Sequence, residues 1–433
     1  MLQPWFVEAK LGIFMHWGIY AVRGIPESWS FHRGQISYED YLKQAEGFTA
    51  ERYDPEAWAD LFRRAGARYA VLTAKHHDGF ALWPTRESDL NVVSRTPARR
   101  DLIGPYCQAM RKAGLKVGIY FSHLDWSQPD YASVLNKRHR DNPDTTDPGR
   151  DNRWSYPPRG TPEDPARWER FLRFHRAQLR ELCEAYRPDL LWFDGDWERD
   201  DEQWRMGELR ELLHAWSPGV VLNSRMRGHG DYETPEQGIP IQRPRGPWEF
   251  CVTMNNSWGY QPADRNYKSV RQIVRMLCEC IGMGGNLLLD IGPRPDGTIP
   301  EEQVERLEGL GRWVQKHHEA VFGTQAGLPH GHHYGTSTLS ADRRTLYATV
   351  FDRPVEGVAI KGIRNKVLRA SVLGHEDSLP HRKVGGASWI NLPGVLWVDV
   401  PERLLDGEAT VLKIELEGPL DLYTGAGQAV ESN

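Results

Sequence analysis

Residues 187–196 read Arg-Pro-Asp-Leu-Leu-Trp-Phe-Asp-Gly-Asp. Four apolar residues lead to Asp194, and a glycine follows directly. A continuous apolar run between turn-forming residues predicts a strand covered on both faces, as in a parallel sheet. Asp194 is then expected at the carboxyl end of that strand, where α/β enzymes carry their chemistry. The alternative interpretation is an aspartate that caps a helix in the following loop.

The first three quarters of the chain alternate short apolar runs with amphipathic helical patterns. Strands are expected at residues 11–16, 69–73, 115–121, 190–194, 219–223 and 286–291. Helices are expected between and after them, at residues 54–65, 101–113, 168–186, 204–216, 268–283 and 301–321. Repeated strand–helix units of this length predict an α/β fold with a (β/α)8-like barrel over residues 1–325.

The pattern changes after residue 325. Short strand patterns occur at residues 346–351, 357–360, 367–372, 395–400 and 409–416, separated by Gly, Pro, Asn and Asp. This spacing predicts a C-terminal antiparallel β-sandwich domain over residues 326–433. A polar segment at residues 127–165 is expected to form a long loop on the barrel.

Composition excludes several classes of function. The 433 residues carry a net charge of −5 without a concentrated basic face, so no nucleic-acid partner is expected. No apolar stretch is long enough for a membrane span, and the first residues lead us to expect no secretion signal. Five cysteines without a repeated spacing argue against a disulfide framework and favour the cytoplasm. The 17 tryptophans suit either core packing or stacking on sugar faces.

Polar residues follow five successive predicted strands, which implies a polar pocket at one face of the barrel. They are His16, the pair His76 and His77, His123, Asp194, and Asn223 to Arg225.

Three kinds of chemistry could use this pocket, and the first two are metal catalysis and nucleophilic catalysis by serine or cysteine. His16, His76, His77 and Asp78 have the donor types of a metal site, but adjacent histidines on an extended chain point to opposite sides. No Gly-x-Ser-x-Gly elbow occurs, and no cysteine lies beside an obvious base. The histidines suit a hydroxyl-rich ligand better than a metal, so no metal is expected.

Glycoside hydrolysis needs two carboxyl groups near one site. Asp194 is the natural nucleophile, and Arg225 or the histidines could keep it ionised. Its partner must be a proton donor with a raised pKa. Candidates beyond the fifth predicted strand are Glu233, Glu236 and Glu249.

The motifs of this chain closely resemble those of the α-L-fucosidases of glycoside hydrolase family 29. They are Gly12-Ile-Phe-Met-His-Trp-Gly18, Ala74-Lys-His-His-Asp-Gly-Phe80, Leu191-Trp-Phe-Asp194 and Gly284-Gly-Asn-Leu-Leu-Leu289 through Gly292-Pro293, with Trp248-Glu249 and Ser257-Trp-Gly-Tyr260 in addition. The resemblance covers about residues 5–325 in the right order, and the family also has a C-terminal β-domain.

The resemblance implies a retaining, two-step mechanism in which Asp194 is the nucleophile. It further implies that fucose is held or flanked by residues matching the family's sugar-site positions: His16, His76, His77, Trp192, Arg225 and Trp29. In many members a Glu-Trp pair lies near the first loop, whereas this chain has Ser28 before Trp29, which leaves a role for Glu27 in doubt.

The acid/base is less fixed by the resemblance. Glu236 lies in Thr234-Pro-Glu236, which looks like the Thr-x-Glu of bacterial members, and Glu249 is the fallback. We therefore expect a cofactor-free exo-glycosidase that acts on fucosylated oligosaccharides or glycoconjugates. A glycosidase on a related, α-galactose-like sugar and a catalytically weak fucose-binding protein are the alternatives. A homo-oligomer is left open.

Overall fold

The computed structural model describes residues 2–131 and 164–425, so residues 132–163 of the predicted loop lie outside the described residues. Contacts between Cα atoms divide the chain into two compact units. The first comprises Met1–Gly238, Gly246–Tyr267 and Leu288–Glu308, and the second comprises Ile239–Arg245, Lys268–Leu287 and Gly309–Asn433. The units interleave along the chain, and the boundary at residue 325 stays a prediction.

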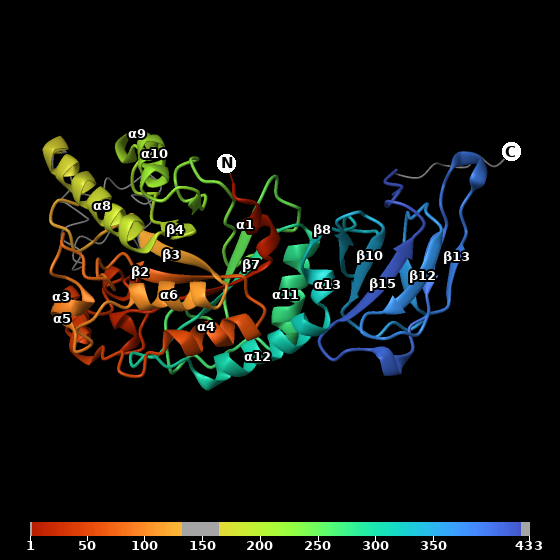
Figure 1. The fold of residues 1–433 in the computed structure, drawn as a ribbon, viewed down its shortest axis with the longest axis horizontal. Helices are drawn as coiled ribbons and strands as arrows, with labels where there is room; N and C mark the ends of the chain where they lie inside the picture. The colour runs from red at the N-terminus through yellow and green to blue at the C-terminus, as the bar shows by residue number, and fades with distance from the viewer. Residues whose placement is uncertain (1, 132–163, 426–433) are drawn as a thin grey trace. The chain divides into compact units, whose positions relative to one another are not determined.

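A seven-stranded sheet with the order β5-β4-β3-β2-β1-β7-β6 forms the centre of the α/β part (Figure 1). Neighbours from β1 through β5 pair in parallel. The strands are β1 (Leu11–Met15), β2 (Tyr69–Lys75), β3 (Lys116–Ser122), β4 (Leu190–Asp194), β5 (Val221–Leu222), β6 (Glu249–Thr253) and β7 (Asn286–Ile291). Nearly every residue in them is buried, which explains why they read as continuous apolar runs.

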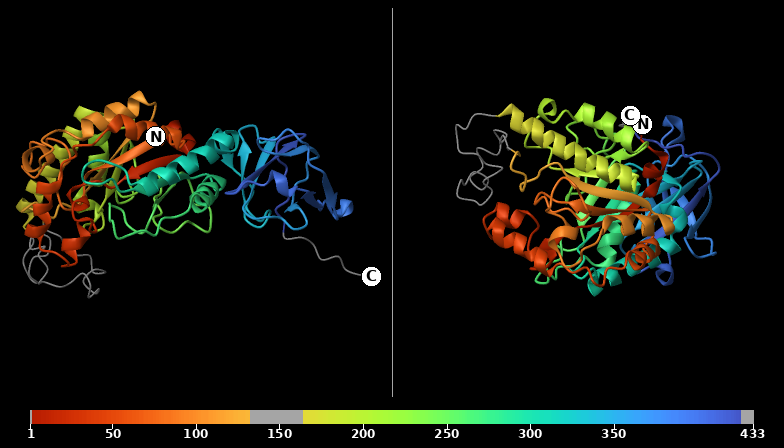
Figure 2. Two further views of the ribbon diagram at one scale, coloured as in Figure 1. Left: turned by 90° about the horizontal axis from the view of Figure 1, so that it is seen from below. Right: turned by 60° about the vertical axis from the view of Figure 1, so that its left-hand side comes forward.

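The longer helices that follow these strands are α4 (Pro55–Arg64), α6 (Ile103–Lys112), α8 (Pro165–Tyr186), α10 (Met206–Trp216), α11 (Val270–Gly282) and α12 (Glu301–Lys316). In the first unit α4 contacts α6, α6 contacts α8, and α8 contacts α10, so these helices cover one face of the sheet in chain order (Figure 2). Side chains of Asp54, Asp164 and Ser269 accept backbone N–H bonds at the starts of α4, α8 and α11.

Short helices fill the connections: α1 (Pro4–Ala9), α2 (Trp29–His32), α3 (Tyr38–Leu42), α5 (Val92–Arg95), α9 (Asp201–Trp204) and α13 (His318–Val321), with 3₁₀ turns at Ile19–Ala21, Lys43–Gly47, Ser388–Ile390 and Glu402–Leu404. None of the helices among the described residues is long and apolar enough to span a bilayer.

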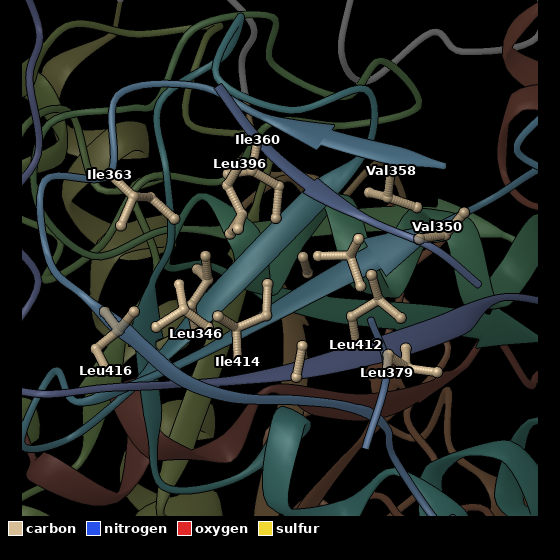
Figure 3. Close-up of a cluster of buried hydrophobic side chains, with 14 of the residues drawn as sticks. Leu346, Val350, Val358, Ile360, Ile363, Leu379, Leu396, Leu412, Ile414 and Leu416 are labelled. Carbon is tan, nitrogen blue, oxygen red and sulfur yellow. The ribbon is translucent and has the colours of Figure 1, made fainter. Parts of the chain in front are cut away.

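The second unit contains two antiparallel sheets. One has the order β12-β15-β10-β9-β8 and the other β11-β14-β13. Their strands are β8 (Thr324–Ala326), β9 (Thr336–Ser340), β10 (Thr345–Val350), β11 (Val358–Ile360), β12 (Val367–Val372), β13 (His381–Val384), β14 (Val395–Val398) and β15 (Thr410–Leu416). Buried side chains of both sheets, such as Leu346 and Ile414 from one and Ile360 and Leu396 from the other, form a single core (Figure 3).

The predicted strands and helices are present, with shifted ends. Only Val221–Leu222 of the fifth expected strand is extended, and the last expected helix divides into α12 and α13 at His317. The sequence did not predict β6, β8, β9 and β13. β6 begins on a glutamate and β13 is mostly exposed, so neither shows an uninterrupted apolar run.

Side chains on the inner face of the sheet form layers. Phe14, Tyr120 and Trp192 lie together in one buried cluster above Tyr69. A Cβ on Gly12 would lie 2.3 to 2.6 Å from the ring of Tyr69, so the absence of a side chain at Gly12 makes room for this ring.

We predict that Gly12→Ala lowers the free energy of unfolding by about 1–3 kcal/mol, because the added Cβ overlaps the Tyr69 ring, which is fully buried. Gly407→Ala is the control, since a Cβ there meets no atom within 4 Å. Urea denaturation measures both variants. Equal stabilities would show that the Tyr69 ring moves easily.

Candidate active site

Asp194 is the last residue of β4, on the same face of the strand as Trp192. Its side chain is 13% exposed. The Oδ2 atom accepts a hydrogen bond from the Tyr120 hydroxyl at 3.0 Å, and Oδ1 accepts one from the Gly195 N–H at 3.0 Å. The strand end therefore presents a partly accessible carboxylate with fixed donors around it.

Arg225 joins two carboxylates. Its Nη1 donates to Asp194 Oδ1, and its Nη2 donates to Glu236 Oε2. Glu236 has a side chain that is 35% exposed and lies beside β6 through a bridge with Cys251. The two acids that were predicted as the catalytic pair thus lie within the span of one guanidinium group.

The electrostatic environment favours an ionised Asp194. Burial alone would raise the pKa of this carboxyl, but the charge of Arg225 is the largest influence in the other direction and holds it well below the ordinary value. Burial alone would lower the pKa of Arg225, whereas Asp194 and Glu236 raise it above its ordinary range. The arginine therefore stays charged throughout the working pH range of proteins.

The rings of His76 and His77 lie on the same side, with centroids 4.3 Å apart. The expectation that adjacent histidines point apart is wrong here, because β2 ends at Lys75 and the backbone turns directly after it. The turn is closed by a bond from Gly79 N to His76 O at 3.1 Å. His77 Nε2 then lies 3.6 Å from Asp194 Oδ2.

Each site histidine has one ring nitrogen held by a neighbour. His77 Nδ1 lies 2.6 Å from Ser122 Oγ, whose hydroxyl donates to Leu124 O at 2.8 Å. Because that hydroxyl proton is used, His77 Nδ1–H is the donor and Nε2 is left as an acceptor. His76 Nδ1 bonds Ser28 Oγ.

His16 is held from β7. Its Nδ1 lies 2.6 Å from Asp290 Oδ1, and both side chains are almost fully buried. Burial lowers the pKa of His16 well below its ordinary value, lowers that of His76 to about 4, and lowers that of His77 well below the ordinary value. All three rings are therefore neutral at physiological pH.

Aromatic rings border this cluster. Trp192 packs against Phe14 at 5.0 Å and Tyr120 at 5.7 Å, with the Arg225 guanidinium carbon 5.0 Å from its ring centroid. Trp29 is half-buried, and its ring meets the His77 ring edge-on at 5.4 Å. Both predicted tryptophans thus lie beside the predicted polar residues.

Glu249 has a different environment. It is fully buried at the start of β6 and accepts hydrogen bonds from Trp192 Nε1 at 2.8 Å, from the Tyr232 hydroxyl at 3.2 Å and from the Tyr69 hydroxyl. Tyr69 begins β2, whereas Asp194 ends β4, and the two strands run in the same direction through β3. Glu249 therefore lies toward the opposite end of the strands from Asp194.

His76, His77 and Asp194 each offer one ligand atom, and these atoms lie within 4.8 Å of one another. A divalent cation there would compete with Arg225, which already carries a positive charge to Asp194. The arrangement suits hydrogen bonding by neutral rings better than metal coordination.

Sequence reasoning missed the groups that hold the predicted residues. Tyr120, Ser122 and Asp290 bond Asp194, His77 and His16 respectively. The alternation of side chains along a strand could have pointed to Tyr120 and Ser122, because they lie two residues apart on β3 and pair with Trp192 and Asp194.

A separate cavity of about 260 Å³ lies within the second unit, between α11 and the start of β9. Met283 and Leu328 are among its lining residues, and none of the residues predicted for the site lines it.

The site has two carboxylates at the carboxyl edge of a parallel sheet, with neutral donors and acceptors and aromatic rings around them. This arrangement is typical of a glycoside hydrolase. The sequence model described as Alpha-L-fucosidase matches residues 1–319. The chain belongs to the α-L-fucosidase family.

Individual relatives agree with this placement. The tissue α-L-fucosidase of Rattus norvegicus is 33% identical over 390 residues, covering 82% of this chain and 78% of the rat protein. The solved α-L-fucosidase isoenzyme 1 from Paenibacillus thiaminolyticus superposes with a TM-score of 0.82 at 33% identity, covering 95% of this chain and 98% of that one. A GH29 α-L-fucosidase from Bacteroides thetaiotaomicron, solved as a trapped covalent intermediate with 2-fluoro-fucosyl fluoride, gives 0.81 at 25% identity with 95% coverage of both chains.

The burial of Glu249 predicts a specific pH dependence of stability. Burial outweighs the hydrogen bonds that it accepts, so its pKa is raised from 4.5 to about 7. Between these pH values the folded protein binds more protons than the unfolded chain, so the carboxyl makes stability fall as the pH rises.

Glu249→Gln removes this titration. Its free energy of unfolding relative to the wild type should therefore increase by about 1–3 kcal/mol from about pH 5 to about pH 8. Urea melts of both proteins at the two pH values give the double difference. A difference that does not change with pH would mean that Glu249 does not titrate in this range.

Proposed function

We propose that this chain removes terminal α-linked L-fucose from glycans by a retaining double displacement, with Asp194 as nucleophile and Glu236 as acid/base. The family membership supports the reaction. The observation that carries the assignment of residues is the shared guanidinium of Arg225, which brings the two carboxylates together. Retaining glycosidases hold their two carboxyl groups about 5–5.5 Å apart, a spacing that one guanidinium group can span.

In the first step an Asp194 oxygen attacks the anomeric carbon of fucose as the bond to the leaving oxygen breaks. Glu236 gives its proton to that oxygen, so the leaving group departs as an alcohol. In the second step Glu236 takes a proton from water, the water oxygen bonds to the anomeric carbon, and the Asp194 carboxylate is released. Two inversions give net retention of the anomeric configuration.

Two features support Glu236 over Glu249 as the acid/base. Glu236 is partly exposed beside Arg225, so a leaving glycan and water can approach it. Glu249 is sealed from solvent by three donors, including Trp192. In this proposal Glu249 instead orients Trp192 from beneath the site.

Neutral histidines suit the hydroxyl groups of a sugar. The free Nε2 of His77 can accept a hydrogen bond from one hydroxyl next to Asp194, and His16 and His76 offer further ring nitrogens. The C6 of fucose is a methyl group, and the rings of Trp192 and Trp29 give this site apolar faces. A fucosylated oligosaccharide or glycoconjugate is therefore the proposed substrate. The intact carboxylate pair argues against a protein that only binds fucose.

We also propose that residues 231–237 close the sheet into an eight-stranded barrel. On one side Asp231 N donates to Leu222 O at 2.7 Å, in β5. On the other side Glu249 N donates to Glu233 O at 2.9 Å, in β6. This segment carries Glu236, so closure of the barrel would bring the acid/base to the same edge as Asp194. The cytoplasmic location stays a prediction.

Asp194→Ala should lower the hydrolysis of an aryl α-L-fucoside by about 10³-fold or more, because no atom remains to form the glycosyl-enzyme. Added azide should occupy the vacated space, restore part of the turnover and yield β-fucosyl azide after a single inversion. Asp194→Asn is the matched control, since it removes the charge but leaves no room for azide. Turnover of Asp194→Ala at the wild-type rate would rule out Asp194 as the nucleophile.

Glu236→Ala should lose the basic limb of the pH–rate profile and retain activity mainly on fucosides with good leaving groups. With azide this variant should give α-fucosyl azide, because azide attacks after the glycosyl-enzyme has formed. Glu233→Ala, an exposed glutamate on the same segment, should behave as the wild type. The same pattern in Glu249→Ala rather than Glu236→Ala would assign the acid/base to the other carboxyl.

A further inference from the structure

His123 contacts the backbone of Asp194 and that of Arg225, the arginine that joins the two proposed catalytic carboxylates. It follows directly after β3, and its N–H donates to the carbonyl oxygen of Asp194 at 2.8 Å. Its ring atom Nε2 lies 3.0 Å from the carbonyl oxygen of Arg225. One fully buried residue therefore links the end of β4, through its backbone, to the loop after β5, through its side chain.

The ring continues into a chain of hydrogen bonds on α8. His123 Nδ1 lies 3.0 Å from His175 Nε2, and His175 Nδ1 lies 3.2 Å from Arg176 Nη1. A carbonyl oxygen can only accept, and an arginine can only donate. If both rings are neutral, each has one donor and one acceptor nitrogen. The chain can then run in only one direction, from Arg176 through His175 and His123 to the Arg225 carbonyl.

The surroundings of the two rings favour the neutral forms. Burial lowers the pKa of His123 to about 3 and that of His175 well below its ordinary value. The positive charges of Arg176 and of Lys75, which is itself bonded to Asp125, act in the same direction. Only the bond to Arg225 O and the charge of Asp194 favour a proton on His123, and burial outweighs them. The tautomers are therefore fixed.

Packing fixes the ring plane as well. The His123 ring stacks on Phe193 with centroids 4.5 Å apart and an interplanar angle of 13°. The centroid of the His175 ring lies 5.3 Å from that of His123, with an interplanar angle of 27°. The centroid of the Trp204 ring lies 5.4 Å from that of His123. Neither His123 nor His175 is exposed to solvent, so water does not replace a lost bond without rearrangement.

We infer that His123 is a positioning residue, which ties the main chain of Arg225 to that of Asp194 and so keeps the guanidinium between the two carboxylates, while His175 and Arg176 fix its tautomer. This inference rests on the proposed roles of Asp194 and Glu236. His123 does not face the sugar. It acts on the reaction through Arg225, and displacements of about 1 Å in such a constellation can cost about 10²-fold in rate.

The test compares His123→Phe with His123→Gln. Phenylalanine keeps the stack on Phe193 but removes the bonds to Arg225 and His175, so kcat on an aryl α-L-fucoside should fall by about 10–100-fold with KM nearly unchanged. Glutamine retains an amide N–H for Arg225 O and an amide oxygen for His175, so it should recover most of kcat. Labelling with 2-fluoro-fucosyl fluoride counts the competent sites, and kcat is expressed per labelled site.

The pH profile separates positioning from a purely structural role. When Arg225 moves away from Asp194, the pKa of that carboxyl rises, so the acidic limb of kcat/KM should move up by roughly 1 pH unit in His123→Phe. The other titratable groups that interact with Asp194 are the same in all variants: Tyr120, His16, His76, His77, Asp196 and Cys251. A merely destabilised protein would lose labelled sites and keep its acidic limb.

Arg176→Met provides a second variant in case His123→Phe does not fold, since Arg176 is only partly buried. It leaves His175 Nδ1 and the carbonyl oxygen of Trp204 without their donor and should lower kcat per labelled site by about 2–10-fold with a smaller shift of the acidic limb. Arg173→Met, an exposed arginine on the same helix, should match the wild type.

Wild-type kcat per labelled site and an unmoved acidic limb in both His123→Phe and Arg176→Met would overturn the inference. The proposed function fails separately, when the fluorosugar labels a residue other than Asp194 in the wild-type protein.

Discussion

The site depends on one cation shared by two carboxylates. Asp194 lies at a strand end where burial works against its charge, and the guanidinium of Arg225 reverses that effect while also bonding Glu236. An arginine suits this position because its planar fork offers parallel donors and stays charged when desolvated. Without it, two acids would face each other beside a buried strand end, and one of them would have to take up a proton.

The layers beneath the site explain how a buried strand end can be polar. Along β4, Trp192 lies in the aromatic layer and Asp194 lies above it, because alternate residues face the same way. Tyr120 repeats this arrangement on β3, but its hydroxyl reaches up to Asp194. Glu249 then accepts the indole N–H of Trp192 from below, so that the ring supporting the site has no unsatisfied polar atom.

The sequence predicted the elements whose physics is local. The strand at residues 190–194 is recognisable because a parallel strand buried on both faces must be continuously apolar. β6 was not predicted because its first residue, Glu249, is charged in isolation. Its burial is possible only through hydroxyl and indole donors from distant segments. The family resemblance supplied Asp194, Arg225 and Glu236 as separate residues, whereas their bonding through one guanidinium is a tertiary fact that no spacing along the chain reveals.

The histidine pair shows the same limit in a different form. Strand periodicity sends neighbours to opposite sides, and that rule failed at His76 and His77 because the strand ends one residue earlier. The failure has a chemical consequence. Two buried rings beside Asp194 could have been two further cations competing with Arg225 for the same carboxylate, but burial keeps both neutral. Charge in the site is therefore confined to the arginine and the acids, and the rings remain free to exchange hydrogen bonds with an uncharged sugar.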